Sequence, residues 1–115
     1  METKIASTII EQILSIDKWS LGSYAAQNLK VIKEGGDFRG GLYFECNGYN
    51  VKGAVSIRLH WNDTYTILFH NDKGKVMREV TSVYFESLVE VLDFIEEKNH
   101  NQNPLSELLS NINLN

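Results

Sequence analysis

Apolar residues recur at helical spacing near both ends of this 115-residue chain. Over residues 3–16 charged and amide side chains occupy one side, and the apolar side consists of Ile5, Ile9, Ile10, Ile13, Leu14 and Ile16. This pattern predicts an amphipathic helix that buries one side in a core. A second helical pattern begins at Thr81 or Ser82 and runs to about Lys98, and its apolar stripe consists of Tyr84, Leu88, Val91, Leu92 and Ile95.

Between these two patterns the period changes to two, which is typical of strands with one buried face. The predicted strands are residues 29–33, 42–46, 51–61, 65–69 and 75–81. Their inward positions are Leu42, Phe44, Cys46, Val51, Val55, Ile57, Leu59, Trp61, Tyr65, Ile67, Phe69, Val76 and Val80. The last strand has a weaker pattern with Lys and Arg, as expected of an edge strand. Ser20 is expected to cap a short helix near residues 21–28.

The connections between strands predict their register. Asn47-Gly48 is a strong signal for a two-residue hairpin turn, which would place Phe44 opposite Val51. An odd loop of residues 62–64, or a bulge, keeps Ile67 on the inner face and places it beside Leu59.

One further turn completes the meander. Residues 71–74, Asn-Asp-Lys-Gly, fit a type I turn with glycine in the left-handed position. The order of elements predicts an α+β fold, in which an N-terminal helix and C-terminal helices pack on one face of an antiparallel meander of four to five strands.

We expect residues 1–115 to form a single domain, because the chain is too short for two. Residues 99–103 are predicted to be a linker, and Pro104 begins a short helix over residues 104–112. Its apolar stripe is Leu105, Leu108, Leu109 and Ile112. We expect this stripe to dock on the domain or to pair with a second copy, which gives a monomer or a homodimer.

The net charge is −4, and nearly all of the excess acid lies after residue 81. General attraction to nucleic acid is therefore not expected. The predicted last helix carries an acidic row at its outer face, formed by Glu86, Glu90, Asp93 and Glu97. Regularly spaced carboxylates can occupy a basic groove on a protein partner. A solvated helix face without a partner is the other interpretation.

The glycine-rich segment 35–41 is predicted to be a loop that exposes Phe38 and Arg39. Aromatic and arginine side chains are favoured anchors in interfaces, so both are candidate partner-binding residues. In the other interpretation the loop is plain and Phe38 folds back onto the core. The segment lacks the lysine and the following helix that a phosphate-binding loop requires.

The polar face of the predicted sheet gives an alternative site. Tyr43, Lys52, Arg58 and His60 are aromatic and basic residues of the kind that bind RNA on open sheets. Protein binding through the acidic row is the first hypothesis, and nucleic-acid binding by this face is the second.

No pattern of catalytic or metal-ligating residues is recognisable. The chain has three histidines and one cysteine, and their spacing fits no zinc site. His60 and His70 are expected near Thr66 and Ser56, well apart on the polar face. Cys46 is expected to be an inert buried thiol. We therefore expect no cofactor, no metal and no enzymatic activity.

The beginning of the chain does not resemble a signal peptide, and no apolar run approaches the length of a membrane span. We therefore expect no membrane association and a location in the cytosol, either of a bacterium or of its host.

A resemblance adds an expected origin. The segments TIIEQI, WSLGSYAAQNLKVI, NDTYTILFHNDKGKV and VYFESLVEVLDFIEE, within residues 8–97, resemble small proteins of bacterial phages and related mobile elements. The resemblance implies a phage or mobile-element accessory protein in the bacterial host cytosol, and it assigns no activity and no site residue. The glycine-rich segment 35–41 and the tail from Pro104 depart from the shared pattern. Combined with the acidic row, this origin favours an inhibitor of a host defence enzyme that handles nucleic acid, such as a CRISPR nuclease.

Overall fold

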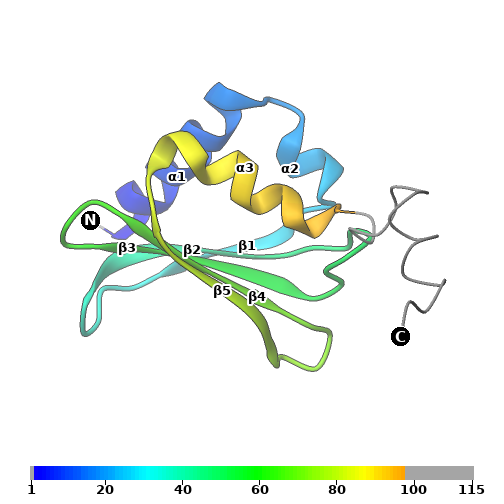
Figure 1. Ribbon diagram of the computed structural model, residues 1–115. Helices are drawn as coiled ribbons and strands as arrows, with labels where there is room; N and C mark the ends of the chain where they lie inside the picture. The colour runs from blue at the N-terminus through cyan, green and yellow to red at the C-terminus, as the bar shows by residue number, and fades with distance from the viewer. Residues whose placement is uncertain (1, 98–115) are drawn as a thin grey trace, which may run out of the picture.

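The computed structural model describes residues 2–97 and confirms the α+β fold (Figure 1). One antiparallel sheet has the order β1-β2-β3-β4-β5, and the helices cover one of its faces. The elements are α1 (Glu2–Ile16), α2 (Ser20–Ser23), β1 (Gln27–Ile32), β2 (Phe38–Glu45), β3 (Ala54–His60), β4 (Tyr65–His70), β5 (Val76–Val83), η1 (Phe85–Ser87), α3 (Leu88–Leu92) and η2 (Asp93–Ile95). The predicted linker 99–103, the helix 104–112 and its apolar stripe lie outside the described residues.

The core lies between the helices and the inner face of the sheet. It contains the predicted inward positions Leu42, Phe44, Val55, Ile57, Ile67 and Phe69, together with Ile9, Ile13, Leu88, Leu92 and Ile95 from the helices. Helix α1 packs chiefly on β2. Because it covers β1 less, Leu14 and Ile16, which were predicted on its apolar side, are 39% and 45% exposed.

The connection from β2 to β3 corrects the predicted hairpin. Phe44 pairs with Val55 instead of Val51, and residues 46–53 form a longer loop. Neither Asn47 nor Gly48 has the positive φ that the predicted turn requires. The loop instead packs against the end of η2, where the Asn50 and Val51 N–H groups donate to the Ile95 carbonyl. The register moves by an even number of residues, so the inner face is unchanged.

The β3–β4 hairpin confirms a loop with an odd number of residues, which lies one residue earlier in the chain than predicted. His60 and Thr64 flank the three residues 61–63, and Ile57 pairs with Ile67, which therefore does not lie opposite Leu59. The next hairpin has the predicted turn: the Gly74 N–H donates to the Asn71 carbonyl, and Gly74 has φ +82.

The predicted last helix is shorter and interrupted. Strand β5 continues to Val83 through Ser82, which has φ +57, and Tyr84 is extended and 62% exposed instead of buried. The chain then forms a C-terminal helical segment, defined here as residues 85–95, of one α-helical turn between two 3₁₀ turns. It starts late because pairing with β4 holds the chain in β5 as far as Val83. Val76, predicted inward, is 48% exposed at the start of this edge strand.

The second helix and the first strand also differ from the prediction. Helix α2 ends at Ser23, because Tyr24 turns into the core and is fully buried. Ala25 follows with φ +54, and β1 then begins at Gln27. Ser20 does not cap the helix, since its hydroxyl donates backwards to the Asp17 carbonyl.

Ile57 lies at the centre of the core with no exposed surface. We expect Ile57→Ala to lower the free energy of unfolding by about 2–5 kcal/mol, because it removes buried methyl groups and leaves a cavity. Urea denaturation followed by circular dichroism measures this loss. A loss below about 1 kcal/mol would contradict the assigned packing.

Gly48 provides a second test. A Cβ at this position would lie 2.3 Å from the Ile95 carbonyl oxygen, whereas a Cβ at Gly35 would meet nothing within 4 Å. We expect Gly48→Ala to destabilise the fold by about 1–3 kcal/mol through overpacking, and Gly35→Ala to have little effect. Equal midpoints of urea denaturation for the two variants would contradict the close contact between Gly48 and the Ile95 carbonyl.

Candidate functional site

The acidic row is exposed, but its members are not equivalent. Glu86, Glu90, Asp93 and Glu97 all lie at the surface. Among residues 2–97, Glu86 and Glu90 have no cation at ion-pair distance. Asp93 instead accepts a hydrogen bond of 2.7 Å from the hydroxyl of Tyr24. Glu86 and Glu90 therefore form no ion pair within these residues, whereas Asp93 also stabilises the fold through its hydrogen bond to Tyr24.

The surroundings of Tyr24 show that more acid gathers at this end of the molecule. Burial raises the pKa of Tyr24 far above its ordinary value, and the Asp93 hydrogen bond and the charges of Asp93, Glu96 and Asp17 raise this pKa further. Asp17 is exposed in the connection between α1 and α2, so this charge comes from a different part of the chain than the acidic row. Sequence analysis did not find Asp17, because it is distant in the chain.

Phe38 and Arg39 do not lie in an exposed loop. Both are half-buried in β2, which begins earlier than predicted. A bulge between Phe38 and Gly40 makes the two side chains point in different directions. Phe38 lies on the open face of the sheet, where its ring centroid is 4.7 Å from that of His60. Arg39 forms an ion pair of 2.8 Å with Asp63. The two residues thus belong to different sites.

The open face of the sheet contains most of the alternative set. Arg58 lies over the Phe38 ring, with its guanidinium carbon 5.1 Å from the ring centroid. Tyr43 is paired with Lys30, whose Nζ is 5.7 Å from the tyrosine ring centroid. Lys52 does not lie on a strand, because it falls in the loop 46–53. The structure therefore brings Phe38, Arg58 and His60 together, while Lys52 and Tyr43 line a second cavity of about 750 Å³.

The two histidines of this face make the predicted contacts. His60 hydrogen-bonds Thr66, and His70 hydrogen-bonds Ser56 at 3.2 Å. No group of three or more His, Cys, Asp or Glu side chains is close enough to hold a metal ion within residues 2–97. Cys46 is buried, and burial raises the pKa of its thiol.

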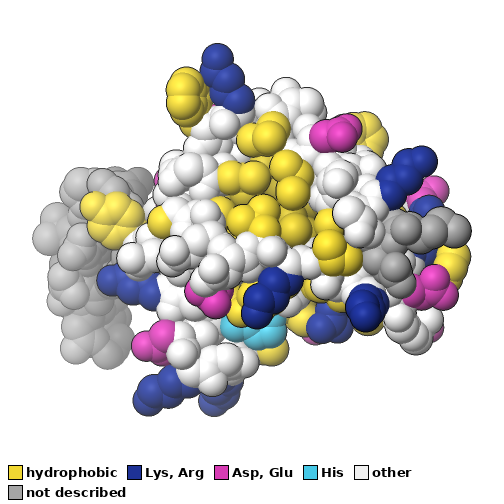
Figure 2. Space-filling view, turned by 180° about the vertical axis from the view of Figure 1, so that it is seen from behind, with side chains coloured by type: hydrophobic (Ala, Val, Ile, Leu, Met, Phe, Trp, Pro, Cys, Tyr) yellow, Lys and Arg dark blue, Asp and Glu magenta, His cyan; other side chains and the backbone are white. Residues whose placement is uncertain are grey.

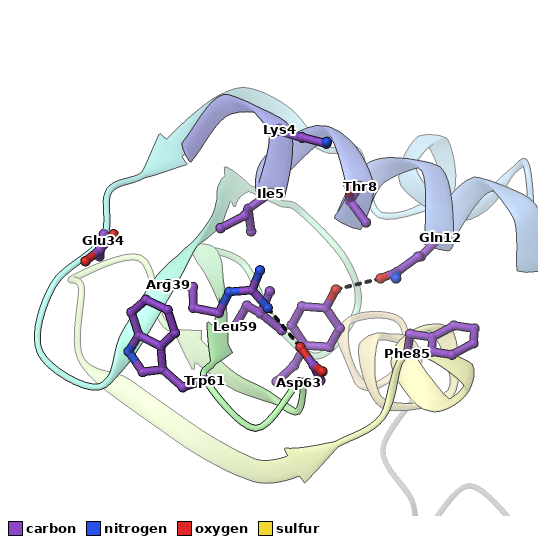
Figure 3. A pocket seen from close by; sticks show the side chains of 11 residues that line it. Lys4, Ile5, Thr8, Gln12, Glu34, Arg39, Leu59, Trp61, Asp63 and Phe85 are labelled. Atoms are coloured by element: carbon purple, nitrogen blue, oxygen red, sulfur yellow. Dashed lines mark hydrogen bonds and ion pairs between the residues drawn. The ribbon is translucent and has the colours of Figure 1, made fainter. Parts of the chain in front are cut away.

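A cleft of about 630 Å³ opens between the first half of α1 and the end of the β3–β4 hairpin (Figure 3). Arg39 reaches into its centre beneath Ile5, with Trp61 on one side and Phe85 on the other. Its lining consists of Lys4, Ile5, Thr8, Gln12, Glu34, Arg39, Leu59, Trp61, Asp63, Tyr65 and Phe85. The Tyr65 hydroxyl donates to Gln12 Oε1 at 2.6 Å.

Sequence analysis missed this cleft because it assigned Trp61 to the core and did not consider Phe85. Trp61 was predicted inward but is 61% exposed, since β3 ends at His60 and Trp61 enters the hairpin loop. Phe85 was not considered and is 49% exposed. The position of Arg39 depends on the bulge in β2, which lies at Gly40 with φ +139; a glycine within a strand is the signal that could have marked it.

A further apolar surface lies on the other side of the molecule. Figure 2 shows hydrophobic side chains gathered on the face seen from behind. Strand β1 is an edge strand of the sheet, and its Leu29 and Val31 are each 42% exposed. No helix within residues 2–97 is long and apolar enough to cross a membrane.

Comparison of the chain with protein-family models, curated proteins and solved structures gives no match. The resemblance to phage proteins stays a prediction from the sequence. The candidate sites are the acidic row, the open sheet face and the cleft, and each is supported by the geometry of the structure alone.

The buried hydroxyl of Tyr24 makes stability depend on alkaline pH. Its pKa is raised above 10.0 in the folded state, so the unfolded chain loses this proton first as the pH rises. The stability is therefore fully present below about pH 10 and falls above it, by up to about 1.4 kcal/mol per pH unit. Urea denaturation between about pH 9 and pH 11 measures the slope. We expect Tyr24→Phe to make the loss of stability with rising pH less steep, because the contribution of this tyrosine, up to one proton, is removed. An unchanged slope would contradict the assigned burial.

Proposed function

We propose that this chain is a non-enzymatic binding protein that holds a basic surface of a protein partner through its acidic row. The observation that carries the proposal is the exposure of Glu86 and Glu90 without a counter-charge among residues 2–97. Asp93 is also exposed on this segment, and it and Asp17 are both close enough to Tyr24 to raise its pKa. A surface with an excess of negative charge steers a positively charged partner and raises its association rate.

The fold gives this surface a rigid base. Leu88, Leu92 and Ile95 are fully buried under the row, and the carbonyl of Ile95 is held by the loop 46–53. The carboxylates therefore stand on a fixed segment, which limits the conformational freedom that is lost when a partner binds.

The partner class follows from the charge and the expected origin. A groove that binds nucleic acid carries Lys and Arg at positions that neutralise phosphates. Carboxylates on a rigid segment offer such a groove a competing anionic surface. With the phage-like resemblance, this supports an accessory protein that acts in a bacterial host cytosol on a defence enzyme that handles nucleic acid.

The open face of the sheet supports a second candidate function, the binding of single-stranded nucleic acid. Phe38, His60 and Arg58 form a contiguous aromatic and basic cluster there, and bases stack on such clusters. Two acidic residues of the sheet oppose the binding of a phosphate backbone. Glu45 pairs with Ala54, and Glu79 pairs with Leu68.

Charge reversal on the row tests the first function. Asp93 is unsuitable because its carboxylate holds Tyr24, so we choose Glu86→Lys with Glu90→Lys. The matched control is Glu11→Lys with Asp72→Lys, which makes the same change of charge at exposed positions of α1 and of the β4–β5 hairpin. We expect the row variant to associate at least about tenfold more slowly with the partner at low salt.

Partners are captured from bacterial lysate by the immobilised chain, identified by mass spectrometry and measured as pure proteins by surface plasmon resonance. The proposal is wrong if the row variant and the control bind alike. If Arg58→Ala instead abolishes the binding of a labelled single-stranded oligonucleotide that the unchanged chain holds, the open sheet face is the functional surface.

A further inference from the structure

Three large aromatic side chains are exposed where the C-terminal helical segment meets the cleft. Trp61, Tyr84 and Phe85 have exposed fractions of 61%, 62% and 49%. Trp61 and Phe85 line the cleft, and Tyr84 directly precedes Phe85. Exposed aromatic residues around a hollow, bordered by charged residues, are typical of the energetic centre of a protein interface.

Two irregularities of the backbone aim polar groups into this cleft. The register of β2 shifts between Phe38 and Gly40, which turns Arg39 toward it. Asp63 occupies the left-handed position of its hairpin with φ +67, where the next hairpin has Gly74 with φ +82. Glycine adopts this conformation at lower cost. An aspartate there is explained by its side chain, which holds the Arg39 guanidinium at 2.8 Å.

The cleft suits an uncharged occupant. Arg39 and Asp63 neutralise one another, and the Tyr65 hydroxyl is paired with Gln12. Lys4 and Glu34 also line the cleft and carry opposite charges, and the remaining walls are chiefly apolar, from Ile5, Leu59, Trp61, Phe85 and the ring of Tyr65. A volume of about 630 Å³ accommodates a large apolar side chain with part of its backbone. The other N–H groups of Arg39 are suited to donate to a backbone carbonyl at the mouth.

We propose that the cleft takes one large apolar side chain, aromatic or leucine-like, from the same basic protein segment that contacts the acidic row. This inference rests on the proposed function. The cleft and the row adjoin in the chain, because Phe85 lines the cleft and the next residue, Glu86, is the first carboxylate of the row. A segment with Lys or Arg beside its apolar anchor therefore meets complementary groups at both places.

Selection from a random 12-residue peptide library displayed on phage tests this proposal, with the full chain as the target. We expect the enriched peptides to share one large apolar residue flanked by Lys or Arg. The strongest peptide is then synthesised with a fluorescent label, and its affinity is measured by anisotropy. Replacing its apolar anchor by alanine is expected to weaken binding at least tenfold.

Variants of the chain locate the peptide. Trp61→Ala and Phe85→Ala each remove an exposed wall of the cleft, and we expect each to weaken binding at least tenfold. Trp19→Ala is the matched control, because Trp19 is 72% exposed and lies outside the cleft. It is expected to leave the affinity unchanged, and circular dichroism checks that all variants remain folded.

The outcomes separate this inference from the proposed function. Basic peptides that respond to Glu86→Lys with Glu90→Lys but not to Trp61→Ala or Phe85→Ala would overturn the cleft proposal and leave the row in place. Apolar peptides that need the cleft but ignore the charge reversal would contradict the acidic-row function. Two other results would exclude a basic segment of another protein as the occupant. Either no peptide is enriched, or the chain associates with itself and Trp61→Ala abolishes that association.

Discussion

The contact between Gly48 and the end of η2 is the constraint on which the exposed surfaces depend. The backbone at Gly48 approaches the Ile95 carbonyl so closely that a Cβ would lie 2.3 Å from its oxygen. The N–H groups of Asn50 and Val51 donate to that carbonyl. These contacts satisfy backbone acceptors that the end of a short helical segment would otherwise leave unpaired. Together with the burial of Leu88 and Leu92, they hold the segment 85–95 in one rotation on the sheet.

That rotation separates buried from exposed side chains along the segment. Leu88, Leu92 and Ile95 point into the core, so Glu86 and Glu90 point away from it. The bond from Tyr24 to Asp93 secures the same orientation from the side of α2. Glu86 and Glu90 thus lie on the helical layer, while Arg58 and Lys30 lie on the open face of the sheet, which also carries Glu45 and Glu79.

The cleft arises from departures from regular structure. A perfect β2 would alternate its side chains between the faces, whereas the bulge turns Arg39 out of that alternation and toward α1. The hairpin after β3 places Asp63 in a left-handed conformation and its carboxylate against Arg39. Bulges and left-handed residues are common beside binding sites, because they direct side chains where regular strands cannot.

The sequence by itself determined the class of the fold and the sides of its elements. Alternating residues from Leu42 to Phe69 predicted a sheet with one buried face, since a strand with apolar residues at every second position is stable only when that face is covered. The exposure of Glu86 and Glu90 followed from helical spacing in the same way. Only the tertiary structure decided the register of Phe44 with Val55, the late start of the last helical segment and the cleft beside Trp61. These features depend on contacts between residues distant in the chain, such as Gly48 with Ile95 and Arg39 with Asp63, which local periodicity does not encode.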